Sequence, residues 1–104
     1  MAEFVTVARV DEVPEGAGRQ FVVGERQIGV FNCAGSWYAI DNVCTHAYAE
    51  LHEGEVDPDD CTVECPLHGS RFDLASGRAL NLPAITPVAV YEVRIAGDEI
   101  QVAL

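Results

Sequence analysis

The chain has 104 residues and a formal net charge of −11 at pH 7, and all six of its positive side chains are arginines. Such an acidic chain is not expected to bind nucleic acid or anionic membranes, because phosphate groups are bound by basic surfaces. The sequence contains no apolar run long enough to span a membrane, and its first residues lack the pattern of a signal peptide. We therefore expect one globular domain, residues 1–104, in the cytoplasm.

Short apolar runs interrupted by glycine, proline, asparagine and aspartate are typical of an all-β domain. No stretch keeps a helical period over three turns, and residues 47–52 have room for one helical turn at most. In chain order, we expect strands at residues 4–8, 20–23, 27–31, 37–41, 62–64, 70–74, 88–95 and 100–104, with a short extended piece at Val56.

Two short motifs indicate a metal site. The first is Cys44-x-His46 and the second is Cys65-x2-His68, with eighteen residues between them. In extended backbone, residues two apart point the same way and lie roughly 6.5 Å apart. That distance is large for two ligands of one zinc ion, whose coordination shell has a radius of about 2.0–2.3 Å. It suits a two-iron cluster in which Cys44 binds one iron and His46 the other, while a structural zinc site stays as the alternative.

The residues after the second cysteine are consistent with a cluster. Pro66 restricts the backbone between the two ligands, and Gly69 lets the backbone pass close to the site. Ser70 offers a hydroxyl that can donate to a sulfide or a thiolate, and such hydrogen bonds raise a cluster's reduction potential.

These motifs, read as Cys44-Thr45-His46 and residues 65–70, resemble those of the Rieske [2Fe-2S] family. The resemblance implies an antiparallel β-sandwich with a small cluster-binding subdomain at about residues 42–75, formed by two ligand loops. It implies that Cys44 and Cys65 bind the inner iron and that His46 and His68 bind the outer iron. The chain is most similar to the soluble ferredoxins that serve bacterial aromatic-ring dioxygenases.

Three positions differ from the Rieske proteins of cytochrome bc complexes. Ala49 and Leu67 stand where those proteins have a pair of disulfide-bonded cysteines, and Phe72 stands where they have a tyrosine. Both differences remove features associated with high reduction potentials. We therefore expect a potential at the low end of the Rieske range, roughly −150 mV.

The remaining cysteines and histidine are expected to have no part in the site. Cys33 falls in a turn, Cys61 lies four residues before Cys65, and we interpret both as bystanders. Four cysteines could form two disulfides in a secreted protein, but the cysteine–histidine pairs favour metal binding instead. His52 is expected at the surface. Leu67, beside His68, is a candidate either for an apolar docking contact or for a cover over the cluster.

An electron carrier is the function that this site predicts. A mononuclear non-haem iron site needs two histidines and a carboxylate, and only His52 is left once the cluster is assigned. No glycine-rich nucleotide-binding loop is present. By resemblance, the expected partners are an NAD(P)H-dependent flavin reductase and a terminal Rieske non-haem iron oxygenase, and the carrier itself is expected to be a monomer. The alternatives are a subunit of a nitrite-reductase-type complex, a ferredoxin linked to iron–sulfur assembly, or a structural zinc module.

Overall fold

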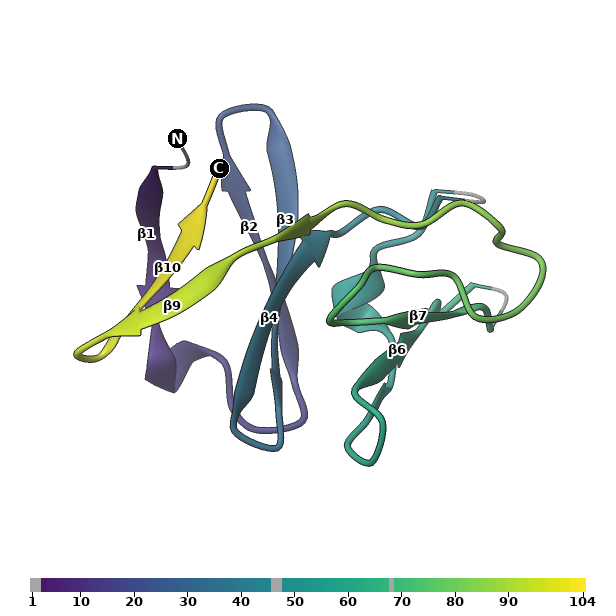
Figure 1. Cartoon of the computed structure of the whole chain (residues 1–104), viewed down its shortest axis with the longest axis horizontal. Coiled ribbons are helices and arrows are strands. Elements are labelled where there is room, and N and C mark those ends of the chain that lie inside the picture. The colour runs from purple at the N-terminus through teal and green to yellow at the C-terminus, as the bar shows by residue number, and fades with distance from the viewer. Residues whose placement is uncertain (1–2, 46–47, 68) are drawn as a thin grey trace.

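The computed structural model describes residues 3–45, 48–67 and 69–104, and its regular elements are short antiparallel strands and two 3-10 turns (Figure 1). The prediction of an all-β fold is confirmed. In the part of the chain that the structure describes, no helix is long and apolar enough to cross a membrane. The elements are β1 (Phe4–Arg9), η1 (Val10–Glu12), β2 (Gly18–Val23), β3 (Arg26–Cys33), β4 (Ser36–Asp41), η2 (Leu51–Glu53), β5 (Val56–Asp57), β6 (Thr62–Glu64), β7 (Arg71–Asp73), β8 (Val90–Tyr91), β9 (Val93–Ala96) and β10 (Glu99–Ala103).

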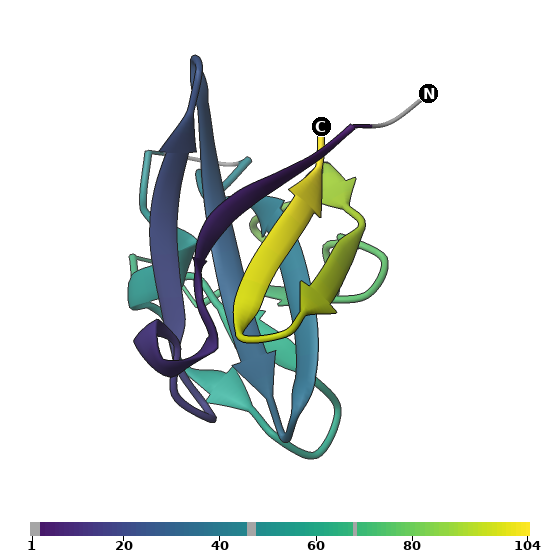
Figure 2. The ribbon, with the colours of Figure 1, turned by 90° about the vertical axis from the view of Figure 1, so that its left-hand side faces the viewer.

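The strands form three sheets, ordered β1-β10-β9, β2-β3-β4-β8 and β5-β6-β7. In Figure 1 these sheets lie from left to right, and both chain ends lie on the left, away from the third sheet. Figure 2 shows the β1-β10-β9 layer in front of the blue strands of the central sheet. We call the third sheet, together with the loops that surround it, the cluster-binding lobe (residues 42–88).

The central sheet is buried on both faces because β3 alternates between two cores. Ile28 and Val30 pack against the β1-β10-β9 sheet, while Phe31 and Cys33 pack against the lobe. Successive side chains of a strand point to opposite faces, so a continuous apolar run serves both cores. Gly29 is required within this run, since a Cβ atom there would lie 2.6 Å from the side-chain oxygen of Asn42.

The expected strand at residues 88–95 is divided between two sheets. Tyr91 pairs with Ala39 of β4, whereas Val93 pairs with Val102 of β10. Between them, the carbonyl of Glu92 accepts a hydrogen bond from the backbone N–H of Ala103 at 2.9 Å. The sequence alternation continues through this change of partner, which is why the pattern alone predicts one strand.

A disulfide joins Cys33 and Cys61. Disulfides were not expected from the sequence, because Cys44 and Cys65 are paired with histidines, and this bond between the other two cysteines was not predicted. Cys33 is also not in a turn, since it is the buried last residue of β3. The bond connects the central sheet to the turn that precedes β6, so it links the body of the protein to the lobe.

Candidate metal centre

The two ligand loops close in the same way. The backbone N–H of Cys44 donates to the carbonyl of Ala49 at 2.9 Å, and that of Cys65 donates to the carbonyl of Ser70 at 2.7 Å. The backbone N–H of each cysteine therefore donates a hydrogen bond to the residue five positions further along the chain, and each motif lies inside the loop that this hydrogen bond closes. His46 and His68 lie outside the described residues, so their positions stay a prediction.

Both motif cysteines are buried in the same core. Cys44 is 4% exposed and Cys65 is 1% exposed, and both pack in a cluster that includes Leu51 and Phe72. The disulfide is formed by the other two cysteines. A pair of thiolates in apolar surroundings is strongly disfavoured unless a cation compensates the charge. Two buried thiols brought together from separate loops therefore fit a metal cluster.

Ser70 is placed to assist such a cluster. Its side chain is fully buried, and its Oγ accepts a hydrogen bond from the backbone N–H of Ala84 at 3.0 Å. Since the oxygen is the acceptor in this bond, the hydroxyl proton is available to donate to a sulfur atom. The preceding residue, Gly69, has a φ of 77°, a conformation that glycine adopts without the steric penalty of a side chain.

No group of three or more His, Cys, Asp or Glu side chains converges as a metal site among residues 3–45, 48–67 and 69–104. Two of the four predicted cluster ligands are outside these ranges, so this finding does not test the predicted set.

Asn42 fixes the first ligand loop to the body, and the motif analysis missed it. Its side chain is fully buried, and its Nδ2 lies 2.6 Å from Gln20 Oε1 and 2.7 Å from His52 Nδ1. Its Oδ1 accepts the backbone N–H of His52 at 2.8 Å. His52 is half-buried in this network, so its expected surface position is not found. A buried amide between a strand and Cys44 is the signal that could have identified this anchor.

A third loop, residues 79–88, holds both ligand loops, and it too was missed. Thr45 Oγ1 donates to the carbonyl of Thr86 at 2.6 Å, next to the first motif. Asn81 Oδ1 accepts the backbone N–H of Arg71 at 2.6 Å, just after the second motif. Together with the contact between Ala84 and Ser70, these bonds make a three-loop assembly at the right-hand end of the molecule in Figure 1.

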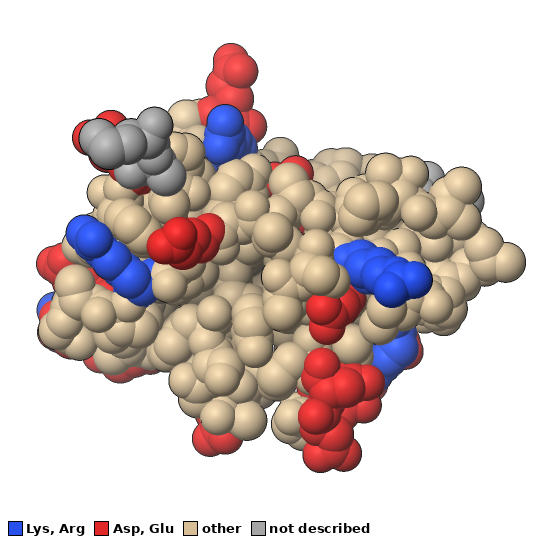
Figure 3. Space-filling view, viewed as in Figure 1, with Lys and Arg blue, Asp and Glu red and all other residues tan. Residues whose placement is uncertain are grey.

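Large apolar side chains on these three loops are exposed. We call them the apolar rim. Ile85 is 78% exposed, Leu82 74%, Tyr48 70% and Leu67 62%. On the face seen in Figure 3, the described residues at the right-hand extremity of the molecule show no Lys, Arg, Asp or Glu side chain. The exposure of Leu67 favours its interpretation as a docking contact over that of a cover for the cluster. The rim consists of Tyr48, Leu67, Leu80, Leu82 and Ile85.

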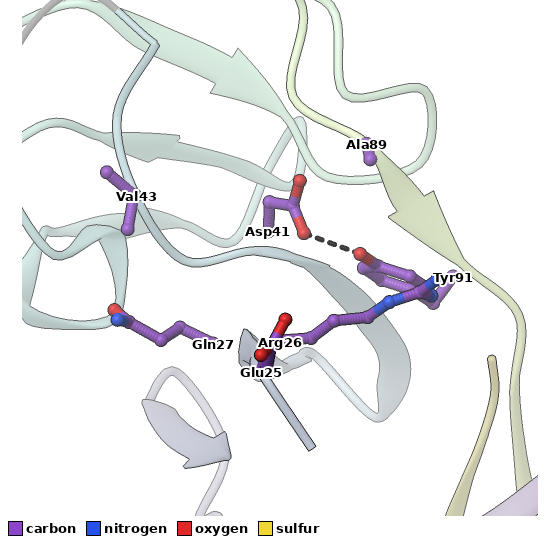
Figure 4. A pocket seen from close by; sticks show the side chains of 7 residues that line it. All are labelled: Glu25, Arg26, Gln27, Asp41, Val43, Ala89 and Tyr91. Carbon is purple, nitrogen blue, oxygen red and sulfur yellow. Dashed lines mark hydrogen bonds between the residues drawn. The ribbon is translucent and has the colours of Figure 1, made fainter. Parts of the chain in front are cut away.

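An open cleft of about 600 Å³ lies beside the start of the first ligand loop, between β3, β4 and β8 (Figure 4). The Tyr91 hydroxyl donates a hydrogen bond to Asp41 Oδ1 at 2.6 Å. The Arg26 guanidinium lies 5.7 Å from the centre of the Tyr91 ring. Burial raises the pKa of Tyr91 above its usual value of 10.0, and the hydrogen bond to Asp41 raises it further. Val43 lines the same cleft next to Cys44, so the cleft adjoins the start of the first ligand loop.

Comparison with known families defines the class of this site. The model of the Rieske [2Fe-2S] domain matches residues 3–92, which include both ligand loops. The chain belongs to this family. It accordingly binds one Rieske-type [2Fe-2S] cluster, as the motifs predicted.

Individual relatives narrow the class. The ferredoxin subunit of 3-phenylpropionate/cinnamic acid dioxygenase from Escherichia coli (strain K12) is 42% identical over 95 residues, which cover 91% of this chain and 88% of the relative. The ferredoxin of carbazole 1,9a-dioxygenase from Nocardioides aromaticivorans IC177 is 39% identical, with a TM-score of 0.91 and 96% of each chain covered. In a complex of reduced oxygenase and oxidized ferredoxin in carbazole 1,9a-dioxygenase, the matching chain is 32% identical, with a TM-score of 0.86 and coverages of 96% and 92%.

One further structure bears on the alternative function. A protein described as a small subunit of an NADH-dependent nitrite reductase from Mycobacterium tuberculosis is 26% identical, with a TM-score of 0.88. The match covers all of this chain and 96% of that chain. Identity is higher to the dioxygenase ferredoxins. This chain is therefore a Rieske-type ferredoxin of the kind found in aromatic dioxygenase systems, and it transfers electrons instead of catalysing the reaction.

Proposed function

We propose that this ferredoxin accepts one electron from an NAD(P)H-dependent flavin reductase and delivers it to a terminal Rieske non-haem iron oxygenase that acts on an aromatic compound. The observation that carries this proposal is the 42% identity to ferredoxin subunits of an aromatic-acid dioxygenase over nearly the whole chain. The carrier would work in the cytoplasm as a monomeric single domain, which agrees with its small size and acidic composition.

We propose Cys44 and Cys65 as the ligands of the inner iron and His46 and His68 as the ligands of the outer iron. When bound, the cluster supplies the one-electron chemistry, because it can be reduced and reoxidised without any change in the protein's covalent bonds. The residues of the chain do the rest. The core around the two cysteines would exclude water from one side of a bound cluster, and the Ser70 hydroxyl would donate to a sulfur atom.

The apolar rim is the surface that would meet both redox partners. Tyr48 and Leu67 of the rim lie on the loops that hold the two proposed histidines, so docking there would bring the outer iron close to the partner's own centre. An exposed apolar patch of this kind is typical of an interaction site. The acidic remainder of the surface would guide a partner with a basic docking patch, and salt would weaken this attraction.

Stopped-flow kinetics with purified partners test the proposal. The reduced ferredoxin is mixed with an aromatic-ring oxygenase from the same gene neighbourhood, and oxidation of the cluster is followed by visible absorbance. Rapid oxidation that slows as salt rises is the expected result. Transfer to a nitrite reductase, but not to the oxygenase, would support the nitrite-reductase alternative instead. A colourless protein that contains zinc would contradict both functions.

A further inference from the structure

The Cys33–Cys61 disulfide has no part in the proposed electron transfer, yet it occupies a central position. Cys33 ends β3, which is buried in the middle of the molecule, and Cys61 immediately precedes β6. β6 runs directly into Cys65, one of the proposed cluster ligands. The bond therefore ties the strand that carries the second ligand loop to the body of the protein.

The cluster itself makes a second link between the same parts. The disulfide closes a segment that contains Cys44, whereas Cys65 lies outside that segment. The proposed cluster bridges Cys44 and Cys65, so it joins the loop anchored on the body to the loop anchored on the lobe. Two cross-links that restrain the same separation support one another, because opening at either one makes opening at the other easier.

Backbone carbonyl oxygens near the disulfide can accept hydrogen bonds from the two thiols that form on reduction. Cys33 Sγ lies 3.7 Å from the carbonyl oxygen of Asp57 and 3.9 Å from that of Pro58, and Cys61 Sγ lies 3.9 Å from the carbonyl oxygen of Cys33. Each thiol would thus have an acceptor for its proton after reduction. Cys61 has a φ of 53°, which is uncommon for a residue with a side chain.

We propose that Cys33–Cys61 is a reversible lock on the cluster-binding lobe, opened by thiol reductants, and that opening it speeds loss of the cluster. Cys33 is fully buried and Cys61 is half-buried, so an external thiolate attacks Cys61 Sγ. The sulfur–sulfur bond breaks, Cys33 leaves as the thiolate, and a mixed disulfide forms on Cys61. A second thiolate then attacks the external sulfur of this mixed disulfide. Cys61 leaves as a thiolate and the reductant is released as its own disulfide. The Cys33 and Cys61 thiolates each take up a proton from solvent, so the protein has gained two electrons and two protons.

Thiol counting tests the lock in the protein as it is isolated. The holoprotein is purified without reductant, denatured in the presence of an alkylating agent, and analysed by mass spectrometry. The expected result is alkylation of two of the four cysteines, and of all four after reduction. Alkylation of all four without reduction overturns the proposal.

Cluster release tests the consequence. Holoprotein is exposed to an iron chelator with and without a thiol reductant, and the loss of visible absorbance is followed. Reduction should speed the loss about 10-fold or more, given the usual contribution of a disulfide to stability. The matched control is the Cys33→Ala/Cys61→Ser double variant, which should lose its cluster rapidly and equally with or without the reductant. Equal acceleration in both proteins, or none in the wild type, overturns the proposal.

A second comparison tests the lock without the Cys33→Ala/Cys61→Ser double variant, in case that variant does not fold. Wild-type holoprotein is reduced mildly, alkylated at the two opened thiols and freed of reductant before the chelator is added. It should lose the cluster at the fast rate. Because these measurements follow the thiols and the cluster of the isolated ferredoxin, failure of the lock leaves the proposed partners untouched, and failure of the partner assay leaves the lock untouched.

Discussion

Asn42 and His52 contact each other twice, once through the amide nitrogen and the imidazole Nδ1, and once through the amide oxygen and the backbone N–H of His52. The paired contacts hold η2 against the strand end that leads to the first ligand loop. The buried amide therefore connects the strand end before Cys44 to β2 of the central sheet and to η2.

Replacement of Asn42 by alanine should destabilise the protein strongly. The change leaves Gln20 Oε1 and the backbone N–H of His52 without their partner. Both groups are half-buried, so each loss costs on the order of 1 kcal/mol, the low end of the range for unsatisfied polar groups. Thermal unfolding followed by circular dichroism measures the effect. Glu53→Ala, at an exposed position of the same turn, is the control and should leave the midpoint nearly unchanged. Equal midpoints for the two variants would contradict the role of Asn42.

Replacement of Ser70 by alanine should lower the reduction potential. Loss of a hydrogen bond to a charged acceptor is worth about 1.5–3 kcal/mol. Only the part of this energy that differs between the reduced and oxidised cluster changes the potential, so the decrease is at most about 60–130 mV for one electron. Potentiometric titration of the cluster checks the value. Ser70→Thr keeps the hydroxyl and should stay near the wild-type potential. An unchanged potential in the alanine variant would show that the hydroxyl does not reach a sulfur atom.

The wild-type potential itself is expected near −150 mV, at the low end of the Rieske range. Replacement of His68 by cysteine should lower it, because a thiolate adds negative charge to a cluster whose oxidised form is otherwise neutral. The same titration, combined with electron paramagnetic resonance of the reduced protein, measures both. A wild-type value above +100 mV would contradict the interpretation of Ala49, Leu67 and Phe72.

Substitution of the apolar rim should slow electron transfer without altering the cluster. Ile85→Asp places a charge in the centre of the proposed contact, and the rate with the oxygenase should fall about 10-fold or more, as for the loss of a central interface contact. Val22→Asp is the control, since Val22 is 63% exposed on β2, outside the lobe. The rim is not the docking surface if the two variants transfer electrons equally fast at equal potentials.

The stability of the protein should fall with alkaline pH because of Tyr91. Its pKa is raised in the folded state, above the ordinary value of 10.0 that applies when the chain is unfolded. The folded state therefore holds this proton more tightly, and the associated stability is complete below pH 10 and is lost as the pH rises through the folded-state pKa. Denaturant unfolding between pH 9 and 11 should show a steeper loss for wild type than for Tyr91→Phe. Parallel curves would contradict the assignment.

The sequence predicted the class of the site and most of the fold because those signals are local. The spacing inside each motif identifies a cluster from residues two or three positions apart, and the strands emerge from alternation over a few residues. The contacts that position the site are not local. Thr45 and Thr86 are 41 positions apart, and Cys33 and Cys61 are 28 apart. Contacts between residues so far apart leave no periodic pattern in the sequence. The contacts of the third loop and the disulfide therefore became visible only in the structure.

The double-sided burial of the central sheet has a consequence for how this ferredoxin can diverge. A polar side chain substituted on either face of β3 would be buried in one of the two apolar cores. Few substitutions in this strand are therefore compatible with folding. The rim side chains are exposed, so each can be substituted singly without disturbing the packing of a core. On the proposed docking role of the rim, partner choice and folding are encoded in separate parts of the chain. Grafting the exposed rim of one ferredoxin onto the scaffold of another should then transfer its specificity while leaving the scaffold intact.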